Sequence, residues 1–216
     1  MHYRLIPNSF HFENLSLFNT SYRGLHMKNN TYENDVRILG GKFKGKILPV
    51  LDVEGLRPTP SRVRETIFSW IKDSLGNAKV LDLFAGSGAL GLEAYSRGAK
   101  DVTLVELDKD NSSNLKEIAK SMSYDEIHVI NDDALHFLDN VSSTFNIVFI
   151  DPPYKLDIYE KVLEKLLDKN LIDDDSLIYV EMRNGSNKIV PGYEIIREEN
   201  AGQSKYSLWT KSKLLF

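Results

Sequence analysis

The chain of 216 residues contains no cysteine, so it offers neither a disulfide bond nor a thiolate metal site. Its five histidines are scattered without the spacing of metal ligands, and we expect no metal site. No apolar run approaches the roughly 20 residues that a membrane-spanning helix needs. We therefore expect a cytoplasmic protein without a membrane partner, long enough for one domain with a proper core.

The most informative motif is Asp151-Pro152-Pro153-Tyr154, which follows an apolar run at 145–150 typical of a buried strand. Proline has no N–H to donate, so the strand must end here with a stiff backbone. The Asp151 carboxylate and the Pro152 carbonyl can accept both hydrogens of an amino group, while the Tyr154 ring offers a flat face to a base. These parts suit a site that holds the exocyclic amine of a nucleobase during transfer to its nitrogen. The alternative is a turn that happens to contain two prolines.

A second buried strand is expected at 79–84, and it runs into a loop with Gly86, Gly88 and Gly91. Glycines let the backbone approach a ligand closely and turn into a helix whose amino end attracts an anionic group. Glu106 follows Gly86 by twenty residues, which is the spacing of an acid that accepts hydrogen bonds from ribose hydroxyls. These features fit NAD and S-adenosylmethionine equally well.

Asp82 favours S-adenosylmethionine, because a carboxylate just before the glycine loop would repel a pyrophosphate but attract an ammonium or sulfonium group. Two bland alternatives stay open: Asp82 may serve the loop as an N-cap-like helper, and Glu106 may be a surface acid. A nicotinamide-dependent oxidoreductase would explain neither Asp82 nor the motif at 151–154. A non-catalytic RNA-binding module would not need an intact Asp151.

Further motifs extend the pattern over about 36–211, and together they resemble the bacterial methyltransferases that modify one guanine of small-subunit ribosomal RNA at N2. Ser61 departs from that family, which often has an acid there. The resemblance rests on Arg37-Ile38-Leu39-Gly40-Gly41, Gly55-Leu56-Arg57-Pro58-Thr59, Arg62-Val63-Arg64-Glu65-Thr66, the segment from Asp82 to Ala94, Asp133-Ala134, Asp151-Pro152-Pro153-Tyr154 and Ala201-Gly202-Gln203.

The resemblance implies an α/β fold of the Rossmann-like class I S-adenosylmethionine-dependent methyltransferases. Its seven-stranded, mostly parallel sheet carries an antiparallel edge strand and is preceded by a β-hairpin and a helix. Asp132 adjoins Asp133, and either could face the ligand. The implied cofactor contacts are Asp82, Phe84, Ala85, Gly86, Ser87, Gly88, Glu106, Leu107, Asp133, Ala134 and Asp151, and the implied catalytic residues are Asp151, Pro152, Pro153 and Tyr154.

Other amino-methyltransferases remain alternatives, namely enzymes that act on adenine N6 or on protein glutamine. These commonly have asparagine at the position of Asp151, so the acid favours guanine N2. The substrate is expected to be small-subunit ribosomal RNA, either naked or within an assembled particle, and the protein is expected to be a monomer.

The net charge of −4 seems unsuited to an RNA partner, but its distribution is uneven. The segment 37–64 holds seven basic and two acidic residues, the footprint of a local phosphate-binding face on an acidic body. A solvated charge run is the alternative, and Arg57 and Arg62 could pair with acids of the same domain. The predicted RNA contacts are Arg37, Lys42, Lys44, Lys46, Arg57, Arg62 and Arg64.

Strand and helix patterns alternate, which predicts a parallel sheet with helices on both faces. We expect a hairpin at 37–48, a helix beginning at Thr59-Pro60, and a C-terminal hairpin at 193–210. Residues 1–35 predict a poorly ordered extension, 36–78 an RNA-contact region, 79–211 the cofactor-binding and catalytic core, and 212–216 a tail. The expected sheet strands are 79–84, 101–106, 127–131, 145–150 and 176–182, and the helices between them are 88–97, 108–122 and 157–169.

Overall fold

The computed structural model describes residues 36–51, 59–123, 125–153, 156, 158–186 and 190–213. All of these belong to one compact unit, Glu33–Phe216. The predicted extension at 1–35 lies outside the described residues, as do Arg57, Tyr154 and the last three residues of the predicted tail. Within the described ranges, every helix is too short or too polar to cross a membrane.

A seven-stranded sheet forms the centre of this unit, with the order β5-β4-β3-β6-β7-β9-β8. The predicted fold class is confirmed, since every pairing from β5 to β7 is parallel. The antiparallel strand is β9, which is inserted between β7 and the outermost strand β8. The strands are β3 (Lys79–Asp82), β4 (Asp101–Glu106), β5 (Ile127–Asn131), β6 (Ile147–Ile150), β7 (Leu177–Arg183), β8 (Tyr193–Ala201) and β9 (Ser204–Lys211).

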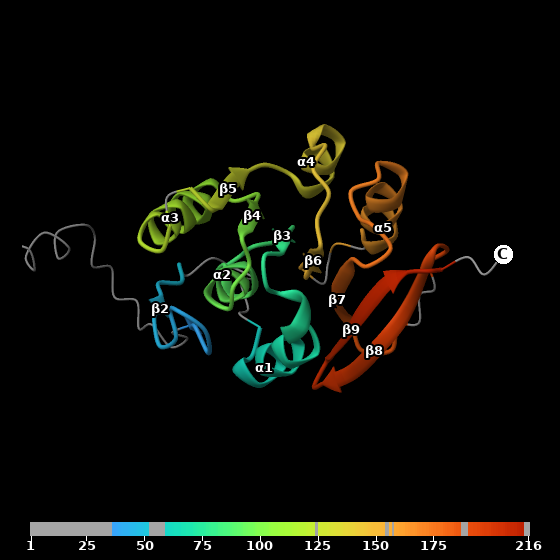
Figure 1. Ribbon diagram of the computed structural model, residues 1–216, viewed down its shortest axis with the longest axis horizontal. Coiled ribbons are helices and arrows are strands. Elements are labelled where there is room, and N and C mark those ends of the chain that lie inside the picture. Colours follow the sequence, from blue (N-terminus) through green and yellow to red (C-terminus); the bar gives the residue numbers. More distant parts are fainter. Residues whose placement is uncertain are drawn as a thin grey trace, which may run out of the picture. The chain divides into compact units, whose positions relative to one another are not determined.

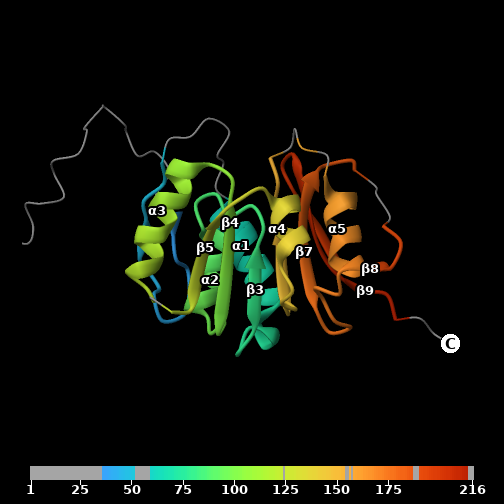
Figure 2. The same ribbon diagram turned by 90° about the horizontal axis from the view of Figure 1, so that it is seen from above.

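Helices cover both faces of the sheet, and Figures 1 and 2 show α1 and α2 on the face opposite to α4 and α5. Successive strand residues point to opposite faces, so Val80 and Phe149 pack with α1, α2 and α3, whereas Leu81 and Val148 pack with α4 and α5. The helices are α1 (Ser61–Trp70), a 3-10 turn η1 (Lys72–Ser74), α2 (Ala89–Ser96), α3 (Lys109–Lys120), α4 (Ala134–Asn140) and α5 (Tyr159–Asp168).

The predicted N-terminal hairpin is present, with short antiparallel strands β1 (Val36–Arg37) and β2 (Ile47–Leu48). Its loop lies against the end of α2, where the Lys42 N–H donates to the Ser96 carbonyl at 2.7 Å. Gly41 has a φ of +77°, and a Cβ at this position would lie 1.8 Å from the Ser96 oxygen. Only glycine therefore allows the hairpin to approach α2 this closely.

Helix α1 follows the predicted pattern, although it begins one residue later, with Pro60 at the N-cap position. Its inner face packs into the core, whereas Arg62, Glu65 and Ser69 point to solvent as expected. The predicted inner residues Val63, Ile67, Ile71 and Leu75 are buried, Trp70 is half-buried, and Phe68 and Arg64 join them without having been predicted.

The Glu93 carboxylate on α2 is fully buried and joins three elements. Its oxygens accept hydrogen bonds from the Leu39 N–H at 2.6 Å and the Gly40 N–H at 2.8 Å, both in the hairpin loop. Arg97 Nε lies 2.6 Å from the same carboxylate, and Arg64 Nη1 of α1 lies 3.5 Å from it. One side chain thus fixes the hairpin, α1 and α2 relative to one another.

The prediction that Arg64 contacts RNA is wrong, because only 2% of this residue is exposed. Its guanidinium donates to the Arg37 carbonyl at 2.8 Å and to the Thr59 carbonyl at 3.2 Å, in addition to its pairing with Glu93. Burial lowers the pKa of Arg64, and the charge of Glu93 opposes this effect. The residue is an internal cross-link rather than a phosphate contact.

We predict that Glu93→Gln lowers the free energy of unfolding by about 3–5 kcal/mol, because it leaves the buried Arg64 cation without its counter-charge. Urea denaturation of both proteins measures this loss. Glu117→Gln is the matched control, since Glu117 forms an exposed ion pair with Lys120 that should contribute less than about 1 kcal/mol. Equal stability of Glu93→Gln and the wild type would contradict the structural role of Glu93.

Candidate functional site

Three predicted site residues, Asp82, Glu106 and Asp151, lie at the carboxyl ends of β3, β4 and β6. These strands are neighbours in the sheet, with β3 between the other two. The structure therefore brings together residues that are up to 69 positions apart in the sequence. This edge is where doubly wound sheets bind their ligands.

The glycine loop 85–88 links β3 to α2 at this edge. Gly86 and Gly88 have φ values of 51° and 73°, which only glycine adopts readily. A Cβ at Gly88 would also lie 2.8 Å from side-chain atoms of Leu92 and Leu115. Helix α2 begins at Ala89 without a side-chain cap, so its first backbone N–H groups are suited to an anionic group of a ligand.

Glu106 holds the glycine loop in place. One of its oxygens accepts from the Gly86 N–H at 2.9 Å, and the other accepts from the Asp108 N–H at 2.8 Å. Each carboxylate oxygen has a second acceptor position, so ribose hydroxyls can still bind there. The neighbouring Leu107 is 68% exposed and provides an apolar surface beside the carboxylate.

Asn111, which sequence reasoning missed, supports the same loop from α3. Its side-chain amide donates to the Gly86 carbonyl at 2.6 Å. Its Oδ1 is a buried acceptor without a hydrogen-bond partner in the described part of the chain. No motif signals this residue, because its contact joins positions that are 25 residues apart.

Asp82 is buried, and its Oδ2 accepts from the Gly91 N–H at 3.0 Å. The bland alternative is therefore partly correct, because this carboxylate does brace the start of α2. Burial raises the pKa of Asp82 from its usual value to about 7, against the effect of its backbone hydrogen bonds. The third glycine, Gly91, allows this close packing, since a Cβ there would lie 2.2 Å from a Leu104 methyl carbon.

Asp151 follows β6 and accepts a hydrogen bond from the Thr59 hydroxyl at 3.2 Å. Burial raises the pKa of Asp151 well above its ordinary value; the charges of Glu181 and Asp82 add to this rise, while the Thr59 hydrogen bond opposes it. Pro152 is buried and Pro153 is exposed, and the Pro153 carbonyl accepts from a backbone N–H at 2.8 Å. The motif thus forms a fixed turn, although Tyr154 lies outside the described residues.

Asp133 and its neighbour Asp132 both have structural tasks at the start of α4. Asp133 caps the helix by accepting from the Leu135 and His136 N–H groups at 2.9 and 3.1 Å. Asp132 pairs with the His136 ring at 2.8 Å, and this hydrogen bond raises the pKa of His136. Ala134 is buried beside them. The adenine contact predicted for Asp133 stays a prediction.

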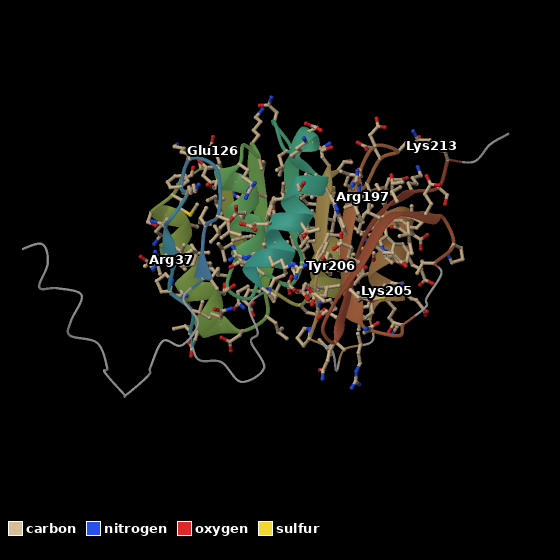
Figure 3. The ribbon with its side chains drawn as sticks, turned by 90° about the horizontal axis from the view of Figure 1, so that it is seen from below. Arg37, Glu126, Arg197, Lys205, Tyr206 and Lys213 are labelled. Atoms are coloured by element: carbon tan, nitrogen blue, oxygen red, sulfur yellow. The ribbon has the colours of Figure 1, made fainter. Side chains whose placement is uncertain are left out.

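The predicted RNA contacts do not form one patch. Lys42 and Lys44 are exposed and Lys46 is half-buried in the hairpin loop, near the end of α2. The Lys42 charge acts on Glu126, which immediately precedes β5, so this loop lies at the amino ends of the strands. Figure 3 shows Glu126 far from Lys205 and Tyr206, which belong to the opposite edge.

The cation nearest to the carboxyl edge is Arg62, which is exposed near the start of α1. It is three residues from Thr59, whose hydroxyl binds Asp151. Its charge also acts on Tyr206 of β9. Arg62 is therefore the described cation of the 37–64 segment that is best placed for RNA near the catalytic motif, whereas the lysines would bind more distant phosphates.

Comparison with known proteins identifies the family. The sequence model of the family described as Conserved hypothetical protein 95 matches residues 36–210. The chain belongs to this family. It is 40% identical over 185 residues to the ribosomal RNA small subunit methyltransferase D of Escherichia coli (strain K12), covering 85% of this chain and 93% of that protein. The resemblance predicted from the motifs is thus confirmed.

Solved structures of family relatives have the same fold. A putative methyltransferase from Escherichia coli superimposes with a TM-score of 0.76 at 39% identity, covering 82% of this chain and 98% of that chain. A putative methylase from Haemophilus influenzae superimposes with a TM-score of 0.73 at 34% identity, covering 83% of this chain and 100% of that chain.

The chemistry of the site fits S-adenosylmethionine. Asp82, Glu106 and Asp133 are carboxylates, and they would face an ammonium group, ribose hydroxyls and an adenine amino group, all of which donate hydrogen bonds. The buried acceptor of Asn111 adds to this set. A pyrophosphate would instead meet the negative charges of Asp82 and Glu106, so the described residues fit a dinucleotide poorly.

We predict that the affinity for S-adenosylmethionine rises with pH, because the positive cofactor favours ionised Asp82 and must displace its proton. The pKa of about 7 in the free protein places this rise below neutrality, with up to about tenfold per pH unit. Titration calorimetry between about pH 5.5 and pH 8 should also detect proton release. Asp82→Asn should flatten this dependence, and an identical pH profile in this variant would exclude Asp82 as its source.

Proposed function

We propose that this protein transfers a methyl group from S-adenosylmethionine to the exocyclic N2 amine of a guanine in small-subunit ribosomal RNA. The observation that carries the proposal is the position of Asp151. Its carboxylate lies at the end of β6, oriented by Thr59, beside the glycine loop that Glu106 holds. A relative at 40% identity is named as a small-subunit ribosomal RNA methyltransferase, which supports the substrate class.

The chemistry requires a nitrogen lone pair that is otherwise delocalised into the guanine ring. Asp151 and the Pro152 carbonyl would accept the two N–H bonds of the amine and favour a pyramidal nitrogen. S-adenosylmethionine supplies a methyl group on a positive sulfur, so the N–C bond forms as the S–C bond breaks and its electron pair remains on sulfur. The nitrogen becomes positive, and the raised pKa of Asp151 suits this carboxylate to accept the proton that leaves. Catalysis is then positioning combined with electrostatic stabilisation.

The target guanine must leave its stack, which costs a few kcal/mol, roughly. Tyr154 is the proposed stacking partner, and a base on an aromatic ring gains about 1–3 kcal/mol. Tyr154→Phe should accordingly be mild, because stacking needs the ring and not the hydroxyl. An acid rather than an asparagine at position 151 favours guanine N2 over adenine N6 as the acceptor.

The remaining assignments are also proposals. Residues 36–78 form the RNA-contact region and 79–211 the catalytic core, with 1–35 as an extension and 212–216 as a tail. The protein acts as a monomer in the cytoplasm, where its substrate is either free ribosomal RNA or an assembled particle. These assignments are supported by the basic residues before β3 and by the ribosomal substrate of the named relatives.

We predict that Asp151→Ala lowers methyl transfer by at least about 100-fold while the affinity for S-adenosylmethionine changes little. Small-subunit RNA and small subunits from cells lacking this protein serve as parallel substrates, and mass spectrometry of nucleosides identifies the product. Asp139→Ala on the outer surface of α4 is the control and should keep full activity. Near-normal turnover of Asp151→Ala would exclude the positioning role, and a methylated adenine would refute the guanine assignment.

We predict that changing Lys42, Lys44 and Lys46 together to Ala flattens the salt dependence of RNA binding by up to three phosphate contacts, each worth roughly 0.7–0.9 in log–log slope. Binding is measured over a salt series, with the α5 triple variant of Lys161, Lys165 and Lys169 as the matched control. Arg62→Ala should remove one contact and also reduce turnover, because Arg62 lies near the catalytic edge. An unchanged slope in the hairpin variant would show that RNA binds elsewhere.

A further inference from the structure

Glu181 on β7 is a buried carboxylate to which the proposed chemistry gives no task, with only 7% of the residue exposed. Strands β6 and β7 are parallel neighbours, and Ile150 is paired with Val180. The next residues along each strand are Asp151 and Glu181. Because parallel strands lie about 4.8 Å apart, these two carboxylates emerge side by side at the carboxyl edge of the sheet.

Both carboxylates point to the face of the sheet that α1 covers. Two residues earlier, the Phe149 and Tyr179 rings form an edge-to-face pair on that face, with centroids 6.1 Å apart. Side chains two positions apart on a strand share a face. Asp151 and Glu181 therefore lie above this aromatic pair, and the Thr59 hydroxyl, just before α1, reaches Asp151 there.

The surroundings hold Glu181 in a defined orientation. The Tyr179 hydroxyl donates to Glu181 Oε2 at 2.8 Å. Across the antiparallel ladder, Glu181 is paired with Tyr206, whose ring stacks on Trp70 at 5.6 Å between centroids. The closeness of the two carboxylates is also evident in their charges, since burial and then Glu181 raise the pKa of Asp151.

Such an arrangement of like charges opposes folding rather than stabilising it. It becomes favourable when a ligand places two adjacent hydrogen-bond donors between the carboxylates. The edge of guanine that carries N1–H and the N2 amine has this pattern. Adenine instead presents an unprotonated N1, so a carboxylate at that position would face a second acceptor.

We propose that Glu181 selects guanine by accepting a hydrogen bond from its N1–H while Asp151 accepts from the N2 amine that receives the methyl group. This inference rests on the proposed function and deepens it. Asp151 then positions the reacting nitrogen, and Glu181 identifies the base. The Tyr179 hydroxyl orients the Glu181 carboxylate from below.

The test compares guanine with 2-aminopurine at the target position, after mass spectrometry of the wild-type product has located that position. 2-Aminopurine keeps the amine but has an N1 that accepts a hydrogen bond. Glu181→Gln can donate its amide N–H to that atom. We expect this variant to lose at least about tenfold in kcat/KM on guanine RNA and to narrow the guanine preference over 2-aminopurine by at least about tenfold.

Glu199→Gln is the matched control, because Glu199 is an exposed glutamate that accepts from the Tyr206 hydroxyl at 2.8 Å. It should keep the wild-type preference. Tyr179→Phe keeps the carboxylate but releases its orientation, and it should weaken the preference to a smaller extent. This second variant tests the proposal if Glu181→Gln does not fold, as judged by thermal unfolding.

An unchanged preference in folded Glu181→Gln, or in Tyr179→Phe if the first variant does not fold, would overturn the role of Glu181. Failure of the proposed function is distinguishable from that result. In that case the wild-type protein itself would not form N2-methylguanine in RNA, whatever residue occupies position 181.

Discussion

The buried carboxylate of Glu93 is the constraint on which the rest of the site depends. It holds the hairpin loop through two backbone N–H groups and pairs with Arg64 of α1. Arg64 in turn donates to the Thr59 carbonyl, and the Thr59 hydroxyl donates to Asp151. A chain of hydrogen bonds thus connects the N-terminal region to the catalytic motif, so a change in Glu93 should affect both stability and the position of Asp151.

The carboxyl edge of the sheet concentrates negative charge in a confined space. Asp82 and Asp151 both have raised pKa values, chiefly because they are buried, and Glu181 adds a third carboxylate. This arrangement costs stability in the free protein. It suits a positively charged cofactor and a nitrogen that becomes positive during transfer, so the strain is useful only when substrate and cofactor are present.

Much of the fold follows from local sequence patterns. Apolar runs predict the strands within one or two residues, and strand–helix alternation predicts the parallel sheet. The glycine loop and the Asp151 motif are local too, because left-handed backbone and proline rings constrain the chain over only a few residues. The family was recognisable from these segments because they keep their order and spacing along the chain.

The sequence by itself therefore determined the elements, the loop and the family, whereas only the tertiary structure decided which charged residues are internal. Arg64 looks like a phosphate contact in the sequence, yet it pairs with Glu93 29 residues away. Thr59 reaches Asp151 across 92 residues, and the register of β6 and β7 brings Glu181 beside it. The lysines lie at the opposite edge from Asp151 because the hairpin runs along α2. Such partners depend on packing between distant segments, which no local pattern records.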